Sequence, residues 1–222
     1  LRLHPLSKVE MRWLVQAILR PLPYLPDELC DLLVDVSEGN PFYVEELVKV
    51  LLDDGVIQRD GETWNLTLTD MSRINIPPTL TGVVQARLDR LLPVERETLQ
   101  RASVIGRIFW AEAVNHLSDT AGGDTLTVLH QKELISRRHL SAFAETAEFM
   151  FKTVVLRDVT YEGVLRRQRR EYHARIADWL QRRGGDSYAG LIAEHYERAG
   201  DLARAADWFG RAGQQAQAMY SP

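Results

Sequence analysis

Residues 27–54 read DELCDLLVDVSEGNPFYVEELVKVLLDD, and this stretch decides the fold class of the chain. Its first half has apolar side chains at the i, i+3, i+4, i+7 spacing of an amphipathic helix, at Leu29, Leu32, Leu33 and Val36. Gly39, Asn40 and Pro41 then separate this helix from the next one. Glycine closes a helix in the left-handed conformation, asparagine caps the following helix, and proline fits its first position. We therefore expect a second helix over residues 41–54.

The rest of the chain shows helical spacing in most places and strand patterns in few. Further helices are predicted over residues 7–20, 79–92, 95–103, 110–117 and 125–134. The C-terminal part is predicted to be helical over 158–183, a degenerate helix pair, and over 188–219, with interruptions at Gly184-Gly185 and Gly200-Asp201. The β pattern predicts a hairpin over 55–66 with its turn at Asp60-Gly61, two strands over 140–143 and 148–151, and the end of a strand over 1–4. Three short helices followed by a two-stranded wing is the order of a winged-helix domain. The predicted fold class is mainly α with minor β.

Composition argues against several classes of protein. The 222 residues include 27 Lys and Arg against 31 Asp and Glu, a net charge of -4, so no overall positive field draws the chain to nucleic acid or to an anionic membrane. Its apolar runs are far shorter than the roughly twenty residues that a membrane-spanning helix needs. The single Cys30 cannot form an internal disulfide or a cysteine zinc site, which fits a reducing cytoplasm.

The sequence also lacks the common catalytic motifs. It contains no G-x-x-x-x-G-K-[ST] loop to hold the β- and γ-phosphates of a nucleotide, no G-x-G-x-x-G, no H-E-x-x-H and no G-x-S-x-G. Its six histidines are scattered, and none is four residues from another. We therefore expect no catalytic residue and no metal site in this chain.

The segment SEGNPFYVEEL at residues 37–47 resembles the part that closes the ATP site in STAND-type signalling NTPases. These are bacterial AAA-like ATPases associated with nucleotide cyclases, kinases or DNA-binding transcription regulators. Further segments resemble the same family in the same order, at residues 3–7, 76–80, 85–91, 102–110 and 157–162. Together they span nearly the whole chain.

The resemblance implies a domain order of P-loop core, helical lid, winged helix and superhelical repeats. Carried onto this chain, it implies a helical lid with a small hairpin at 1–92, a winged-helix domain at 93–157 and the truncated start of a tetratricopeptide-like superhelix at 158–222. Both ends of the chain look like cuts through a longer polypeptide, so the core would precede Leu1. The chain would then be a cytoplasmic regulatory segment, not an enzyme, that closes over ATP or ADP bound by its own upstream P-loop domain.

The resemblance also implies which residues meet the nucleotide. In the family the proline of the Gly-x-Pro segment lies against adenine; here that residue is Pro41, with Gly39 and Asn40 shaping the turn. Plain helix capping explains the same three residues and is compatible with the contact. The family usually has a phosphate-sensing histidine after the last wing strand, but this chain has Thr153. Either the nucleotide is sensed by a weaker latch, or the neighbouring Lys152 substitutes.

The C-terminal part matches tetratricopeptide spacing, in which small residues let two helices touch and aromatic residues fill the gap. The matching residues are Ala193, Tyr196, Gly200, Asp201, Ala205, Phe209 and Ala212. One repeat cannot bury its own faces, so we expect the array to continue past Pro222 and to present a concave surface to a protein or peptide signal.

Two other classes of function remain open from the sequence. The chain could belong to a winged-helix DNA-binding transcription regulator, or it could be a repeat-type protein-interaction scaffold. The predicted recognition helix at 125–134 has little positive charge on its exposed positions, and the basic groups at 137–139 and 166–170 are short. Because specific DNA binders cluster Arg and Lys where they meet phosphates, we expect no nucleic-acid partner. The 166–170 run is interpreted as a solvated helix face, with a nucleic-acid or partner patch as the alternative.

Overall fold

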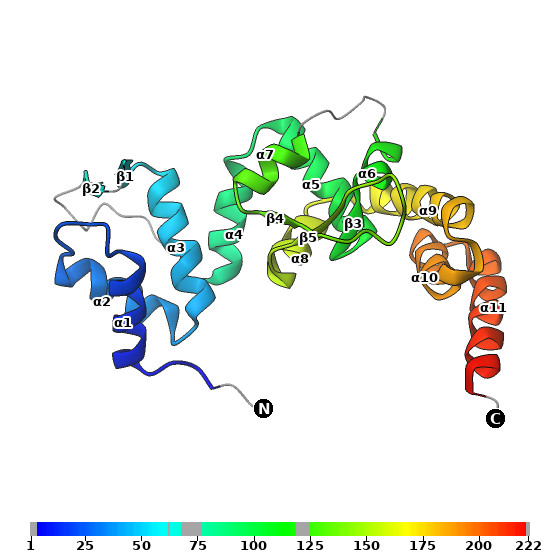
Figure 1. Ribbon diagram of the computed structural model, residues 1–222, viewed down its shortest axis with the longest axis horizontal. Helices are drawn as coiled ribbons and strands as arrows, with labels where there is room; N and C mark the ends of the chain where they lie inside the picture. The colour runs from blue at the N-terminus through cyan, green and yellow to red at the C-terminus, as the bar shows by residue number, and fades with distance from the viewer. Residues whose placement is uncertain (1–3, 62, 68–76, 119–124, 221–222) are drawn as a thin grey trace. The chain divides into compact units, whose positions relative to one another are not determined.

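The computed structural model describes residues 4–61, 63–67, 77–118 and 125–220. The protein is mainly helical, as the sequence predicts, and its few strands are short (Figure 1). The chain forms two compact units, the first unit at residues 1–90 and the second unit at 91–222. The predicted strand at 1–4 lies outside the described residues except for His4, which is not in a strand. Within the described ranges, no helix is both long enough and apolar enough to cross a membrane.

The first unit contains four helices and a hairpin among its described residues. These are α1 (Lys8–Ile18), α2 (Asp27–Ser37), α3 (Pro41–Asp53), β1 (Ile57–Asp60), β2 (Thr63–Leu66) and α4 (Leu80–Asp89). A capping box starts α1: the backbone N–H of Glu10 donates to Ser7 Oγ, and the Glu10 carboxylate accepts from Ser7 N. The strands β1 and β2 are antiparallel, with Asp60 opposite Thr63.

The core of the first unit lies between α1, α2 and α3, which contact one another. The hairpin and α4 both pack on α3. The side chains at the centre are fully buried: Met11, Val15, Leu29, Leu33, Val44, Leu47, Leu51, Ile57 and Val83. Their spacing along each helix is the amphipathic spacing from which the helices were predicted, so burial of these faces is the main source of stability.

A buried ion pair joins α3 to α4. The carboxylate of Glu46 is 3% exposed and accepts hydrogen bonds from the guanidinium of Arg87 and, at 3.0 Å, from Lys49 Nζ. Removing one partner of a buried pair leaves the other charge desolvated and costs about 3–5 kcal/mol. The pair therefore determines which face of α4 packs on α3.

The second unit begins with the element order of a winged helix. The elements are α5 (Pro93–Ile105), β3 (Ile108–Trp110), α6 (Ala111–His116), α7 (Thr125–Gln131), β4 (Ile135–Arg137) and β5 (Glu148–Phe151). The three strands form an antiparallel sheet in the order β3-β5-β4. Phe109 and Phe149 are paired across β3 and β5, and Phe151 pairs with Ile135 of β4, so an aromatic core lies on one side of the sheet.

The strand predicted over 140–143 is wrong. The first wing strand is β4, and residues 140–143 belong to the loop between β4 and β5. Leu140 is 83% exposed, whereas the Phe143 ring is buried at 4.8 Å from the ring of Trp110 and 5.2 Å from that of Trp179. Phe143 therefore anchors a loop, and apolar content alone could not distinguish this from a strand.

The carboxylate of Glu148 closes the wing loop in place of further strand pairing. It is 3% exposed and accepts hydrogen bonds from Trp110 Nε1 at 2.8 Å, from the backbone N–H of Ala142 at 2.9 Å and from Arg138 at 2.7 Å. These bonds satisfy a buried charge and hold the loop against β3.

The rest of the second unit is helical. It comprises α8 (Val154–Glu162), α9 (Arg166–Arg183), the 3-10 turn η2 (Gly185–Tyr188), α10 (Ala189–Ala199) and α11 (Leu202–Tyr220). The stretch predicted to be helical over 158–183 contains a break between α8 and α9. Arg169 stabilises the break by donating to the carbonyls of Val164 at 2.7 Å and Glu162 at 2.9 Å, which have no partner inside the helix.

The turn between α10 and α11 has the residues expected for a helical repeat. Gly200 takes a left-handed conformation with φ +88°, and Asp201 accepts a hydrogen bond from Arg204 N at 3.1 Å. Tyr196 is fully buried, and burial together with Asp178 raises the pKa of its phenol to about 12. Phe209 was expected to fill the gap between helices, but it is 44% exposed, and the neighbouring Trp208 of α11 is buried in its place.

Two histidines meet in the core of the second unit. His173 of α9 and His195 of α10 are 1% and 2% exposed, and their Nδ1 atoms are 2.8 Å apart. The hydroxyl of Tyr161 on α8 lies 2.9 Å from His173 Nε2. The pKa of His173 is lowered to about 3, mainly by burial and then by the partner imidazole and by Arg198, Arg157 and Arg169. The pKa of His195 is lowered to about 4, mainly by burial and then by Arg198 and Arg157, while the backbone of Ile105 raises it.

The histidine pair predicts a loss of stability in mild acid. Both groups have a folded pKa below the unfolded value of 6.5, so the unfolded chain binds more protons as pH falls from 6.5 toward 4. The free energy of unfolding should fall by about 2–4 kcal/mol between pH 7 and pH 5, since each histidine contributes up to about 1.4 kcal/mol per pH unit. Urea denaturation followed by circular dichroism measures this slope.

A matched pair of variants tests the assignment. His173→Gln should remove about half of the slope between pH 7 and pH 5, whereas His139→Gln, at an exposed histidine, should leave it unchanged. An unchanged slope in His173→Gln would contradict the prediction.

Candidate functional site

The turn between α2 and α3 is stabilised by hydrogen bonds within the chain, and its last two residues lie at the surface. Glu38, with φ 50°, and Gly39, with φ +79°, are both left-handed and close α2. Asn40 caps α3 by accepting a hydrogen bond from Phe42 N at 3.1 Å, and Pro41 is the first residue of α3. Asn40 and Pro41 are exposed. The sequence predicted this capping but not the left-handed Glu38.

The turn is held by the segment that precedes α1. The backbone N–H of Leu6 donates to the carbonyl of Gly39 at 2.9 Å. A Cβ on Gly39 would lie 2.5 Å from the carbonyl oxygen of Leu6 and 2.9 Å from the Cβ of Pro5. Glycine is therefore required twice at this position, for its positive φ and for the close approach of the backbone.

A cavity of about 380 Å³ lies beside the turn. It is lined by Leu6, Lys8, Met11, Val34, Asp35, Glu38 and Gly39. Met11 and Val34 give it buried apolar walls, while Lys8 and Asp35 form an exposed ion pair at 2.8 Å that raises the pKa of Lys8. The lining side chains offer apolar contact, the Lys8–Asp35 ion pair and the carboxylate of Glu38.

Tyr43 connects the same helix to the segment before α4. Its hydroxyl donates to the carbonyl of Pro77 at 2.7 Å, and burial with the nearby Glu38 carboxylate raises the pKa of the phenol. The described parts of three segments that carry the family resemblance, at 4–7, 37–47 and 77–80, therefore lie together around the start of α3. The three segments are far apart along the chain, so the sequence did not predict that they lie together.

The two candidate residues of the second unit lie where β5 leads into α8. Lys152 is exposed, and its backbone N–H donates to the carbonyl of Leu134 at 3.1 Å. Thr153 caps α8, with Oγ1 accepting from Leu156 N at 3.2 Å. Capping alone accounts for a threonine at this position. Lys152 and Thr153 belong to the second unit, and Gly39, Asn40 and Pro41 belong to the first.

Sequence reasoning missed the pairing of His173 with His195. The two are 22 residues apart on different helices, so no local spacing indicates their contact. Among the described residues, no group of three or more His, Cys, Asp or Glu side chains is placed to hold a metal ion.

The close approach at Gly39 predicts a large cost for a methyl group there. Gly39→Ala should destabilise the first unit by about 3 kcal/mol or more, because roughly 1–2 kcal/mol of backbone strain adds to overpacking against Leu6 and Pro5. Gly55→Ala is the matched control, since Gly55 has φ +69° but nothing closer than 4.0 Å to an added Cβ. Urea denaturation should show a loss of only about 1–2 kcal/mol for the control; equal losses would refute the steric argument.

Comparison with known proteins places the chain in no named family. No family model matches the sequence. The chain is 26% identical over 224 residues to an uncharacterized protein of Rhizobium meliloti (strain 1021). The alignment covers 97% of this chain but 21% of that protein, so the chain spans about a fifth of the length of the relative it matches.

Proposed function

We propose that this chain is a regulatory segment of a STAND-type signal-transduction ATPase. In this proposal the first unit is a lid that closes over ATP or ADP held by a P-loop domain preceding Leu1, in the cytoplasm. The second unit contributes a winged helix and helical repeats that present a surface to a protein or peptide signal. The segment itself performs no catalysis; binding of a signal would shift the population between closed and open packings.

The observation that carries the proposal is the exposed Pro41 on a turn that needs no ligand to hold its shape. Asn40 caps α3, and Gly39 is clamped to Leu6, so the proline ring is held before any partner arrives. A rigid apolar ring that loses little entropy on contact suits the face of a base. The adjacent cavity, at about 380 Å³, is in the size range of small-molecule sites, roughly 300–1,000 Å³.

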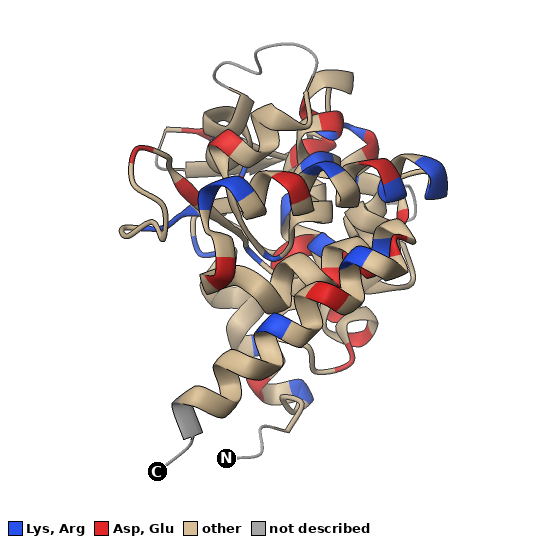
Figure 2. Ribbon diagram, turned by 90° about the vertical axis from the view of Figure 1, so that its right-hand side faces the viewer, with Lys and Arg blue, Asp and Glu red and all other residues tan. Residues whose placement is uncertain are grey.

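A DNA-binding role receives less support from the second unit. Of the exposed cations that follow α7, Lys132 pairs with the buried carboxylate of Glu95 at 2.7 Å and Arg138 with that of Glu148 at 2.7 Å, so both are neutralised. Figure 2 shows Lys and Arg interspersed with Asp and Glu along the helices instead of gathered in one block. Phosphate contacts need unneutralised cations on one face. Salt-dependent duplex binding by this chain would overturn this preference.

The proposal requires a P-loop upstream of Leu1, and the sequence of the full-length protein tests this requirement directly. The residues preceding Leu1 in the full-length protein should contain G-x-x-x-x-G-K-[ST] within the preceding ~200–250 positions. Without that loop, the alternative of a repeat-type scaffold would be favoured.

A proline substitution tests the adenine contact in the full-length protein. Pro41→Ala should raise the Kd for ADP about fivefold, since covering some 40 Å² of the ring contributes about 1 kcal/mol. Pro93→Ala is the matched control, because Pro93 is likewise an exposed proline at the first position of a helix. Fluorescence titration with a labelled ADP measures both, and equal affinity of the parent and Pro41→Ala would contradict the contact.

A second substitution tests the phosphate latch. Thr153→His should slow ADP dissociation from the full-length protein about tenfold or more, because an imidazole donor to a phosphate forms a charge-assisted hydrogen bond. Thr153→Asn keeps a good helix cap without adding charge and should release ADP at the parental rate. Stopped-flow chase experiments give both rates; identical rates for all three proteins would rule out a latch at this position.

A further inference from the structure

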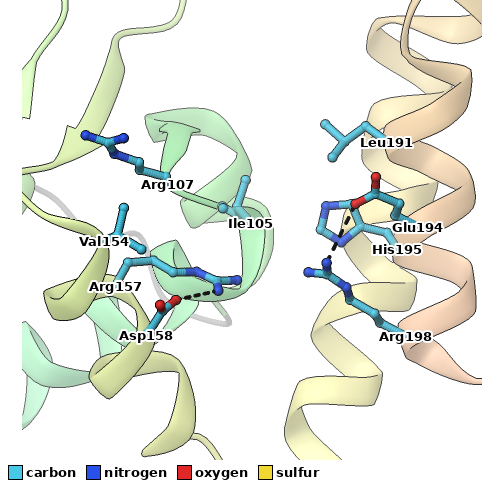
Figure 3. Close-up of a pocket in the computed structure, with 10 residues that line it drawn as sticks. Ile105, Arg107, Val154, Arg157, Asp158, Leu191, Glu194, His195 and Arg198 are labelled. Atoms are coloured by element: carbon cyan, nitrogen blue, oxygen red, sulfur yellow. Dashed lines mark hydrogen bonds and ion pairs between the residues drawn. The ribbon is translucent and has the colours of Figure 1, made fainter. Parts of the chain in front are cut away.

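A second pocket lies inside the second unit, between the α5–β3 turn and α8 on one side and α10 on the other (Figure 3). Its volume is about 260 Å³. Three arginines line it: Arg107 follows α5, Arg157 lies on α8 and Arg198 on α10. Figure 3 shows the guanidinium groups of Arg157 and Arg198 directed toward each other from opposite walls. Convergence of like charges is unfavourable unless an anion or a carboxylate lies between them.

The carboxylates in the pocket neutralise this charge only in part. Asp158 pairs with Arg157 at 3.0 Å, and Glu194 pairs with Arg198 at 3.6 Å along the same helix. Both carboxylates are about half exposed, so these pairs are weak and screened by solvent. Arg107 is exposed and has no ion pair among the described residues. Three arginines thus line a pocket that holds two carboxylates, and the side chain of Arg107 extends away from α10 (Figure 3).

The guanidinium of Arg157 is already held in place. Its Nε donates to the carbonyl of Ser103 at 2.9 Å, and its plane lies over the ring of Tyr161, 4.5 Å from the ring centroid. Nε and Nη1 make its hydrogen bonds to described residues, so Nη2 remains available for a ligand. A fork that is fixed before binding loses little entropy when it meets an oxyanion.

The imidazole of His195 on the same wall reports the electrostatic field. Burial is the main cause that lowers its pKa, and Arg198 and Arg157 lower the pKa further, in the direction expected of nearby positive charge. Among the described residues, the buried Nε2 of His195 lacks a hydrogen-bond partner of good geometry, although the backbone of Ile105 acts on the imidazole and raises its pKa. The wall therefore combines positive potential with an incompletely satisfied polar group.

We propose that this pocket binds a small oxyanion, a phosphate group, between Arg157 of α8 and Arg198 of α10, with Arg107 adding positive charge at its edge. Guanidinium groups bind phosphate oxygens in bidentate geometry. The volume equals that of about nine water molecules at roughly 30 Å³ each, which is enough for a phosphate group. Bound phosphate would join α8 to α10 and so link the winged-helix elements to the first repeat. This site does not depend on the function proposed above.

Isothermal titration calorimetry of the 222-residue chain with inorganic phosphate tests the site. Titrations at pH 7.5 and constant ionic strength should show saturable one-site binding that sodium chloride does not reproduce. AMP and glycerol phosphate are titrated in parallel. Binding of all three would identify the phosphate group of a larger molecule as the ligand, and binding of inorganic phosphate alone would identify the free ion. If none of them binds, the proposal is wrong.

Variants locate the binding in this pocket. Arg198→Ala should weaken phosphate binding at least about tenfold, as expected for loss of a charge-assisted hydrogen bond. Arg167→Ala, at an exposed arginine of α9 outside the pocket lining, should have no effect. Glu194→Gln should tighten binding about two- to fivefold, because it removes a competing exposed carboxylate. Parental affinity in Arg198→Ala would overturn the proposal.

A spectroscopic readout is independent of folding effects in the variants. In the parent chain, saturating phosphate should raise the pKa of His195, measured by NMR titration of its imidazole, because the anion offsets the field of Arg157 and Arg198. Sodium chloride at equal ionic strength should not. An unchanged His195 titration in saturating phosphate would refute binding at this site.

Discussion

The contact between Gly39 and the backbone at Pro5–Leu6 is the constraint on which the first unit depends. Because no Cβ fits between them, the chain before α1 runs directly over the turn that joins α2 to α3, and the Leu6 N–H satisfies a carbonyl at the end of α2. This contact fixes where α1 begins relative to α3. Exposure of Asn40 and Pro41 follows, since the inner side of the turn is already occupied.

Buried polar groups make the packing of both units specific. Glu46 with Arg87 selects one face of α4, Glu148 closes the wing, and His173 with His195 aligns α9 with α10. Apolar surfaces alone would tolerate small rotations of these helices, whereas each buried polar group loses its partner if its helix turns. His173 and His195 also make the second unit sensitive to pH, because their Nδ1 contact requires one nitrogen to donate a proton and the other to accept it.

The two candidate sites differ in chemistry. The turn of the first unit offers a rigid apolar ring beside a cavity, which suits the face of a base. The pocket of the second unit offers guanidinium groups, which suit phosphate oxygens. The ligand proposed for the first site is inferred from a family resemblance and from a P-loop domain expected upstream. The ligand proposed for the second site is inferred from side chains within one compact unit. Each proposed site can therefore be tested independently of the other.

The sequence by itself determined the helices, because burial of one face imposes a period that can be read directly, as at Leu29, Leu33, Leu47 and Leu51. It also predicted the Gly39-Asn40-Pro41 turn, whose residue types are dictated by local backbone geometry. It failed at Phe143, where an apolar side chain anchors a loop, and it did not locate the break after α8, which Arg169 stabilises from the following helix. Only the tertiary structure brought His173 to His195 and Arg157 to Arg198. Contacts between separate helices depend on how the elements pack, and the spacing of residues along a single helix does not predict this packing.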